Sequence, residues 1–482
     1  MPSQAIAGTL VLDEWLDPVG EYVVLDSRGR VERVAWGRPP SWAKVRRVEG
    51  YIHPAFIDAH MHLSWLGLAL YGVDLRGSRS AVEVADRLSK AEGPLAYGRG
   101  WDQEDFDDPG RLPDRRLLDS RIPDRPAVAV RVCGHLAVAN TLALEEARPW
   151  EKYPEHVDRE TGLLREDAVY YTIERLLSKV DVASLVARAA EALASAGVGG
   201  VASMACNPRE AEALARGAGA PLLVACYPRP EHIEASLAVL QGKPGVEVAG
   251  VKLFADGSLG ARTARLRSGY SDDPGNRGVL LLDRRAIVGL ARPVLEAGLR
   301  VAVHAIGDEA LDEVIAAYEI LDPGGQARVE HASIVWPDQL SRLEALKVWI
   351  VAQPRFRVSD WWIDRRLGGR ARYAYRLRSL HKTGMLALST DAPVEPYQPW
   401  ETLQAAQGMC DAPACTGSES LSAREAFYDY TRNAARAAGG PLATAGSLEV
   451  GAPGLLAYTP TPPDSYRWEG PSRLIPTHVY TV

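Results

Sequence analysis

The chain has 482 residues, of which 46% are apolar and 24% are charged, an ordinary composition for a globular protein. Its net charge of −7 argues against nucleic acid as a partner of the chain as a whole, because phosphate binding needs a basic face. A membrane partner is not expected either, since no apolar run reaches the roughly 20 residues that cross a bilayer.

The first residues, MPSQAIAGTLVLDEW, show no basic segment followed by an apolar core, which predicts a cytoplasmic protein. The five cysteines form no CxxC pair, so reduced thiols are expected. Whether Cys410 and Cys415, the two closest in sequence, form a disulfide is left open.

Both ends of the chain contain short apolar segments separated by turns, such as EYVVLDSRGRVERVAWG and GLLAYTP. Residues 1–50 and about 440–482 are therefore expected to pair into one small β domain. The stretch from about 66 to 165 is too long for a simple strand-to-helix connection and predicts an inserted layer.

Residues 51–439 repeat a short apolar run, a loop and an amphipathic stretch, which predicts parallel strands joined by helices. Eight such units indicate a TIM-type (β/α)8 barrel. Helices are expected at 181–196, between Asp181 as N-cap and Gly197, and at 308–321. A doubly wound sheet is the rival fold, but no Gly-rich dinucleotide fingerprint follows the first strand. The expected strands are 51–59, 199–205, 221–226, 248–254, 300–303, 328–330, 348–352 and 385–388.

A histidine pair, His60 and His62 in FIDAHMHL, lies at the end of the first expected strand. Because side chains alternate along a strand, both imidazoles point to the same side, which is inward in a barrel. Neutral imidazole is the commonest metal ligand, so the pair indicates a metal site. Taken alone, an HxH pair is also found among core and surface histidines.

Later strand ends carry residues of the same chemical kind. His304 closes RVAVH, His331 closes RVEH, and Asp391 follows LALST. Lys252 lies inside the apolar run VAGVKLF, where a charged amine is costly and must be paired, neutralised or modified. Since catalytic groups of TIM-type barrels gather where strands end, these residues are expected to complete a metal centre opened by the histidine pair.

Several motifs together resemble the amidohydrolase superfamily, specifically its YtcJ-like amidohydrolase family 3 branch. GRGWDQ and CGHLAVANTLAL resemble segments of the same branch. The resemblance covers nearly the whole chain, and it implies a distorted (β/α)8 barrel flanked by a small β-sandwich from the two chain ends. The motifs, in chain order, are FIDAHMH, VKLFADGSLG, HAIGDEALD, RVEHA, STDAPVEP and GSLEVGAPGLLAYTP.

The resemblance also implies a ligand set for one or two divalent ions. His60 and His62 would bind the more buried ion, and His304 and His331 the second. Lys252, carboxylated on its amine, would bridge the two ions as a carbamate. Zinc suits a site of imidazole and carboxylate, with manganese, iron and cobalt as alternatives.

The same resemblance gives Asp391 a contact to the buried ion and the role of proton shuttle. A divalent ion lowers the pKa of water from 15.7 to about 7, so that hydroxide can attack a carbonyl carbon. Asp391 would then pass the proton to the leaving nitrogen. His135, in CGHLAVAN, is the candidate for a contact to the substrate or to the oxyanion.

Four further residues are candidates for a substrate pocket near the barrel mouth: Trp101, Asp256, Arg262 and Arg355. Packing of the insertion explains Trp101 equally well, and a surface salt bridge is the simpler interpretation of Arg262. Arg355 stands where relatives tend to have a polar residue, a departure that concerns the identity of the substrate.

The predicted function is hydrolysis of a C–N amide bond of the N-acyl or N-formyl amine type in a small-molecule substrate. One alternative is a deaminase or cyclic-amide hydrolase with the same fold. Another is a degenerate family member that binds metal without catalysis. A homo-oligomeric state is left open.

Overall fold

The computed structural model describes residues 3–108, 110–132, 134, 136–409, 418–460 and the backbone of 473–475. Two compact units divide the chain. One combines residues 1–63 with 190–482, and the other comprises residues 64–189. Within the described part of the chain, no helix combines the length and the apolar character that crossing a membrane requires.

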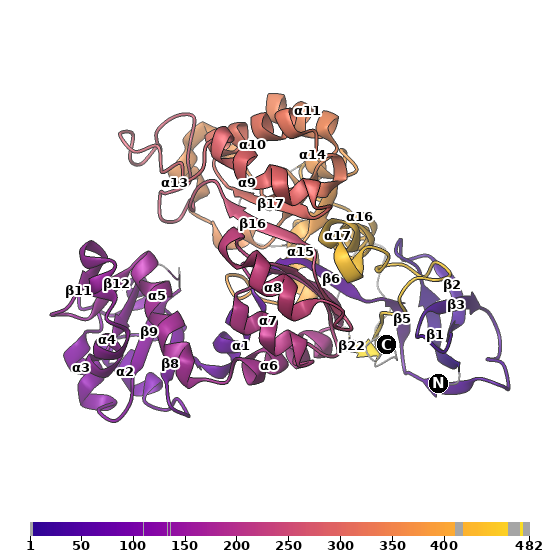
Figure 1. Ribbon diagram of the computed structural model, residues 1–482, viewed down its shortest axis with the longest axis horizontal. Coiled ribbons are helices and arrows are strands. Elements are labelled where there is room, and N and C mark those ends of the chain that lie inside the picture. The colour runs from indigo at the N-terminus through magenta and orange to yellow at the C-terminus, as the bar shows by residue number, and fades with distance from the viewer. Residues whose placement is uncertain are drawn as a thin grey trace. The chain divides into compact units, whose positions relative to one another are not determined.

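Strands from both chain ends pair in one seven-stranded sheet (Figure 1). The late strand β21 runs antiparallel to β5, with Leu456 opposite Pro54. The described strands of this region all belong to this one hydrogen-bonded sheet, and the β-sandwich arrangement stays a prediction. Its members are β1 (Gln4–Leu12), β2 (Pro18–Leu25), β3 (Val31–Ala35), β4 (Lys44–Arg47), β5 (Tyr51–Pro54), β21 (Leu456–Thr459) and β22 (Arg473–Ile475).

The remaining strands of the same unit form two sheets in which every strand pair is parallel. Each of the eight predicted barrel runs contains a strand at or near its expected position. The four-stranded sheet consists of β6 (Phe56–Met61), β13 (Val198–Met204), β14 (Leu223–Tyr227) and β15 (Val246–Val248). The five-stranded sheet consists of β16 (Gly250–Phe254), β17 (Arg300–Ala305), β18 (Ala327–His331), β19 (Trp349–Ala352) and β20 (Leu386–Leu388).

The predicted closed barrel is therefore supported only in part, because the described strand pairs make two sheets and no complete ring. Backbone hydrogen bonds nevertheless join the sheets at both junctions. Asp391 N donates to His60 O at 2.8 Å, which connects the segment after β20 to β6. Lys252 N donates to Pro228 O at 2.9 Å, which connects β16 to the end of β14.

Helices lie between most of these strands, as the alternating pattern predicts. The predicted helix at 308–321 is confirmed, and the one at 181–196 is one residue shorter at each end. Figure 1 shows α9 and α10 beside β16 and β17. The main helices are α6 (Val182–Ser195), α7 (Pro208–Ala215), α8 (Ile233–Leu240), α9 (Arg284–Glu296), α10 (Asp308–Leu321), α11 (Pro337–Leu346), α14 (Leu377–His381), α15 (Pro399–Ala406), α16 (Ala423–Tyr430) and α17 (Arg432–Ala438).

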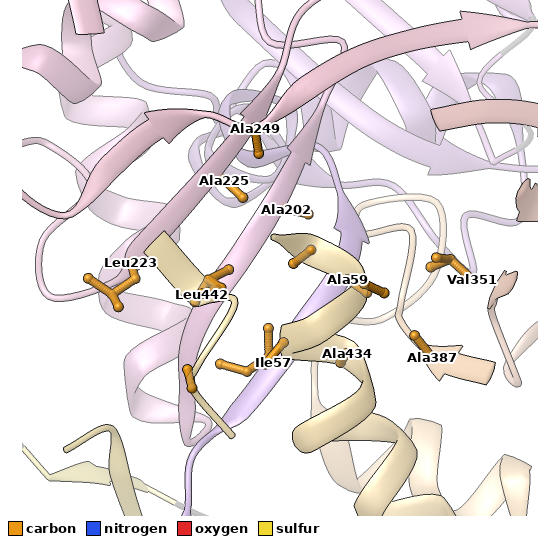
Figure 2. Packing of buried hydrophobic residues seen from close by; sticks show 14 of the residues in the cluster. Ile57, Ala59, Ala202, Leu223, Ala225, Ala249, Val351, Ala387, Ala434 and Leu442 are labelled. Carbon is orange, nitrogen blue, oxygen red and sulfur yellow. The ribbon is translucent and has the colours of Figure 1, made fainter. Parts of the chain in front are cut away.

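A core of small apolar side chains lies beneath the strand ends that carry the predicted ligands. Figure 2 shows Ile57, Ala202, Ala225 and Ala387 gathered near the segments that carry Ala434 of α17 and Leu442. Alanine dominates this cluster because short side chains let a helix approach the strands closely. This packing fixes the strands on which the predicted ligands stand.

Residues 64–189 form a six-stranded sheet with its own hydrophobic core. This unit extends beyond residue 165, where the insertion was expected to end. Its strands are β7 (Val73–Asp74), β8 (Ala96–Trp101), β9 (Ala127–Arg131), β10 (Leu136–Ala139), β11 (Val157–Asp158) and β12 (Leu163–Arg165). Its helices are α2 (Ala81–Leu88), α3 (Arg115–Arg121), α4 (Thr141–Ala147) and α5 (Asp167–Leu176), and α1 (Leu63–Tyr71) begins at the boundary.

The expectation of reduced thiols is wrong for one cysteine pair. Cys206 and Cys226 form a disulfide, with their Cα atoms 6.0 Å apart. They are 20 residues apart in sequence, but β13 and β14 are paired neighbours, and Cys206 follows the end of β13. A search for CxxC spacing cannot find such a pair. Cys410 and Cys415 lie outside the described residues.

Candidate metal centre

The structure brings the six predicted ligands together at the carboxyl ends of the parallel strands. Asp391 Oδ1 lies 3.2 Å from His62 Nε2 and 3.4 Å from His60 Nε2. The six predicted ligands come from β6 (His60 and, just after the strand, His62), β16 (Lys252), β17 (His304), β18 (His331) and the segment after β20 (Asp391).

The other ligand candidates continue this cluster. Lys252 Nζ lies 3.5 Å from His60 Nε2. The ring centre of His331 is 4.8 Å from that of His60 and 4.4 Å from that of His304. The most compact group is formed by His60, His331 and Asp391, whose ligand atoms all lie within 4.8 Å of one another. His331 therefore lies near the buried ligands as well as near His304, its expected partner at the second ion.

Hydrogen bonds determine which nitrogen of His60 and His62 can bind a metal. His60 Nδ1 lies 2.5 Å from Glu330 Oε2, and His62 Nδ1 lies 3.0 Å from the carbonyl oxygen of Met204. Both partners only accept hydrogen bonds, so each Nδ1 must carry the proton. In the neutral imidazole, each Nε2 then presents a lone pair, and both lone pairs lie beside Asp391 Oδ1.

The same argument applies to the other two histidines. His331 Nδ1 donates to Gln353 Oε1 at 2.8 Å, which leaves Nε2 as the ligand atom. His304 has the opposite tautomer, because its Nε2 donates to Gly257 O at 2.9 Å and leaves Nδ1 free. Burial lowers the pKa of His304 to about 3, with a further contribution from Lys252, and burial lowers that of His331 well below its usual value. Both imidazoles are therefore neutral, as metal ligands must be.

Asp391 provides the test of whether a cation fits. Its Oδ1 is buried and accepts no hydrogen bond. The lone pairs of His60 and His62 lie beside this anionic oxygen, an arrangement that is unfavourable without a positive charge between them. A divalent cation would satisfy all three atoms at once. The donor set therefore fits a metal ion.

Strained backbone positions two of these ligands. His331 has φ 72° and Asp391 has φ 62°, in the left-handed region that residues with a Cβ rarely adopt. Such conformations persist where the surrounding structure holds them, and they cluster at active sites. Asp58 helps to hold the backbone next to Asp391. Its carboxylate accepts hydrogen bonds from the preceding residue, from Thr390 Oγ1 at 2.5 Å and from Thr390 N at 3.1 Å.

Lys252 is almost completely buried, at 1% exposure. Burial lowers the pKa of its ammonium group to about 8, although the charges of Glu330 and Asp391 act in the opposite direction. The centre of the Phe254 ring lies 5.0 Å from Nζ. Part of the Lys252 population is therefore the neutral amine near neutral pH, and this is the form that carboxylation requires.

Two buried residues that support the candidate site, Glu330 and Arg328, were not predicted from the sequence. Glu330 holds His60, and Arg328 holds Glu330 through Nε–Oε1 and Nη2–Oε2 contacts of 2.6 and 2.9 Å. Both side chains are fully buried. Burial alone would raise the pKa of Glu330, but Arg328 and His60 keep it below its usual range. The sequence does carry a signal for them, since ARVEH places two opposite charges two residues apart in a short strand. A charged residue inside a strand is also what singled out Lys252.

The predicted pocket residues have other partners in the structure. Asp256 accepts hydrogen bonds from the backbone N–H groups of Ile306, Gly307 and Arg265, so it ties the loop after β16 to the start of α10. Arg262 pairs with Asp272 at 2.9 Å, the salt bridge that was its simpler interpretation.

Arg355 and Trp101 are also accounted for by contacts within their own units. Arg355 faces Glu395 at 3.4 Å and Glu401 at 3.7 Å. Trp101 is fully buried in the core of residues 64–189 and donates its Nε1–H to Ala129 O, which favours the packing role over the pocket role. His135 lies outside the described residues.

Comparison with known proteins identifies the family. The model of the amidohydrolase family matches residues 49–464. YtcJ of Bacillus subtilis (strain 168), a protein assigned to the amidohydrolases, is 30% identical over 455 residues, which cover 86% of this chain and 84% of that protein. The N-substituted formamide deformylase of Arthrobacter pascens is 26% identical, with 89% and 88% of the two chains covered.

A solved structure agrees with this assignment. An uncharacterized metal-dependent hydrolase from Pyrococcus horikoshii OT3 is 34% identical and superposes with a TM-score of 0.84, covering 93% of this chain and 95% of that one. The resemblance inferred from the motifs is thereby confirmed. The chain belongs to the amidohydrolase family of metal-dependent hydrolases.

Proposed function

We propose that this enzyme hydrolyses the C–N amide bond of an N-acyl or N-formyl amine. The observation that carries the proposal is the convergence of imidazole lone pairs on the unpartnered, buried Oδ1 of Asp391. Metal-dependent amide hydrolysis needs a cation-binding site and a carboxylate beside it that can move a proton, and the geometry around Asp391 supports both roles. The similarity to a formamide deformylase supports the choice of bond.

His60, His62, His331 and Asp391 would hold the ion, and the imidazole and carboxylate donors suit zinc. When bound, a divalent ion lowers the pKa of water and polarises the carbonyl oxygen of the substrate. Asp391 would accept the proton from the attacking water and deliver it to the leaving nitrogen, so that the amine departs in neutral form. Glu330 keeps His60 in the tautomer that presents Nε2.

Metal removal and reloading test this function directly. Dialysis against a chelator is expected to abolish hydrolysis of a panel of N-formyl and N-acetyl amines, because the ion supplies both water activation and charge stabilisation. Adding back zinc, manganese, cobalt or iron should restore the rate, measured as amine release. Full activity of verified metal-free protein, or no cleavage of any amide by any reloaded form, would contradict the proposal.

Lys252 would complete a two-ion centre as a carbamate. Its neutral amine attacks carbon dioxide, which forms one N–C bond and releases one proton, and the resulting anion replaces a buried cation. Native mass spectrometry is expected to show the mass of one carbon dioxide on the metal-loaded protein. The Lys252→Ala variant should bind one ion fewer and lose hydrolysis, and added acetate or propionate should restore part of both.

A matched control for Lys252→Ala is Lys243→Ala, which changes an exposed lysine. Lys243→Ala should retain wild-type metal content and rate. An unmodified mass with two bound ions, together with full activity of Lys252→Ala, would exclude the carbamate while leaving the one-ion hydrolase in place.

A further inference from the structure

A small cavity lies at the strand ends, next to the predicted metal ligands. Its volume is about 40 Å³, enough for roughly three or four non-hydrogen atoms. Its lining comprises three apolar and three polar side chains: Leu259, Ile306, Phe356, Ser333, Asp360 and Tyr375.

The cavity adjoins the predicted ligands through the chain itself. Ile306 follows His304 by two residues, and Ser333 follows His331 by two residues, each just beyond the end of its strand. The ring centre of Phe356 lies 6.2 Å from that of His331. The cavity wall and two of the predicted ligands therefore share the segments at the ends of β17 and β18.

The polar side of the cavity is built around a carboxylate. Asp360 accepts a short hydrogen bond from the Tyr375 hydroxyl, which engages one of its two oxygens. Burial raises the pKa of Asp360 to about 7; the bond from Tyr375 opposes this rise, the charge of Glu395 adds to it, and that of Arg366 opposes it. Tyr375 itself is only 7% exposed, so the pair is a fixed feature of the wall.

We propose that this cavity binds the amine-side substituent of the substrate: a short aliphatic chain that ends in a hydrogen-bond donor, which Asp360 accepts. Leu259, Ile306 and Phe356 contact the chain, and the cavity volume suits a chain of about three or four atoms. This inference rests on the proposed function. It adds a substrate class, an N-acyl amino alcohol or N-acyl diamine, to the reaction.

The test compares three N-formyl amines of equal length that end in a methyl, a hydroxyl or an ammonium group. With wild-type enzyme, kcat/KM is expected to be at least about tenfold higher for a donor-ended substrate than for the methyl-ended one, because a substrate that leaves the acceptor oxygen of Asp360 unpaired is disfavoured. In Asp360→Asn, which keeps the shape of the wall, the Tyr375 hydroxyl would engage the one amide oxygen and the NH2 group would face the substrate, so this preference should fall to about twofold or less. Leu259→Phe, which narrows the cavity, should raise KM for all three.

The matched control is Asp364→Asn, which changes an exposed aspartate four residues away and should leave the preference unchanged. Equal kcat/KM for all three substrates, or a preference that survives in Asp360→Asn, would overturn the inference even though amides are hydrolysed.

Calorimetric titration with 3-aminopropan-1-ol separates a failure of the cavity assignment from a failure of the proposed function. If no amide is cleaved, binding of this amino alcohol to wild-type protein that weakens at least about fivefold in Asp360→Asn still supports the cavity assignment. Absence of binding overturns it.

Discussion

The Asp391→Asn variant is expected to lose amide hydrolysis, with kcat reduced by about 10²- to 10⁴-fold, the usual contribution of a positioned general acid or base. Asparagine keeps the size of the side chain but removes the anionic oxygen that lies 3.2 Å from His62 Nε2 and 3.4 Å from His60 Nε2. It can neither accept the proton of water nor balance the charge of a cation. The measurement is steady-state kinetics on the best amide of the panel, with metal content determined on the same samples.

Metal content distinguishes the two roles of Asp391. A variant that keeps its metal but loses kcat assigns the residue to proton transfer, whereas one that loses metal assigns it to binding. The control is Asp429→Asn, which also neutralises a fully buried carboxylate but one that pairs with His381 and Asn433. A metal-loaded Asp391→Asn enzyme within threefold of the wild-type rate would rule out the catalytic assignment.

The ligand candidates could be predicted from the sequence because the histidines and Asp391 stand at the ends of apolar runs, and Lys252 is a charged residue inside one. Strand periodicity places His60 and His62, and the alternation of strands and helices brings His304 and His331 to the same edge of the parallel strands. These inferences need only local patterns and one topological rule. The same rule located the strands of both sheets.

Features that depend on pairing across the fold could not be predicted. The partner of His60 is Glu330, 270 residues away, and the disulfide joins Cys206 to Cys226 on neighbouring strands. Periodicity also does not reveal whether two sheets close into a ring, since closure depends on hydrogen bonds between the first and last strands. Trp101 shows the limit for aromatic residues, because a core position and a pocket wall have the same local pattern.

The Glu330→Ala variant is expected to lower the free energy of unfolding by about 3–5 kcal/mol, the cost of leaving one partner of a buried ion pair uncompensated. Arg328 and Glu330 are both fully buried, and Arg328 has only backbone carbonyls and the Tyr227 ring as further described partners. Chemical denaturation of metal-free protein measures this loss. The matched control is Glu319→Ala, which breaks a half-exposed pair with Arg342 and should cost about 1 kcal/mol or less.

A double variant, Arg328→Met with Glu330→Gln, checks that the cost comes from the stranded charge. Removing both charges should be less destabilising than the sum of the two single changes, with a coupling of about 0.5–3 kcal/mol. Additive losses would show that the two residues contribute independently, and the ion-pair explanation would then be wrong.

Glu330→Gln tests the link from this pair to the metal centre. The glutamine keeps the shape of the side chain, and its carbonyl oxygen can still accept the Nδ1 proton of His60, but the negative charge that makes His60 a stronger ligand is gone. Metal affinity is therefore expected to fall by about 10- to 100-fold, the usual effect of changing a residue that orients a ligand. Competition with a chelator measures this affinity. Wild-type affinity in a folded Glu330→Gln protein would show that Glu330 stabilises the fold without tuning the metal centre. The expected loss would instead give the strand ARVEH two roles: it supplies one ligand, His331, and it supplies Glu330, the group that positions the ligand His60.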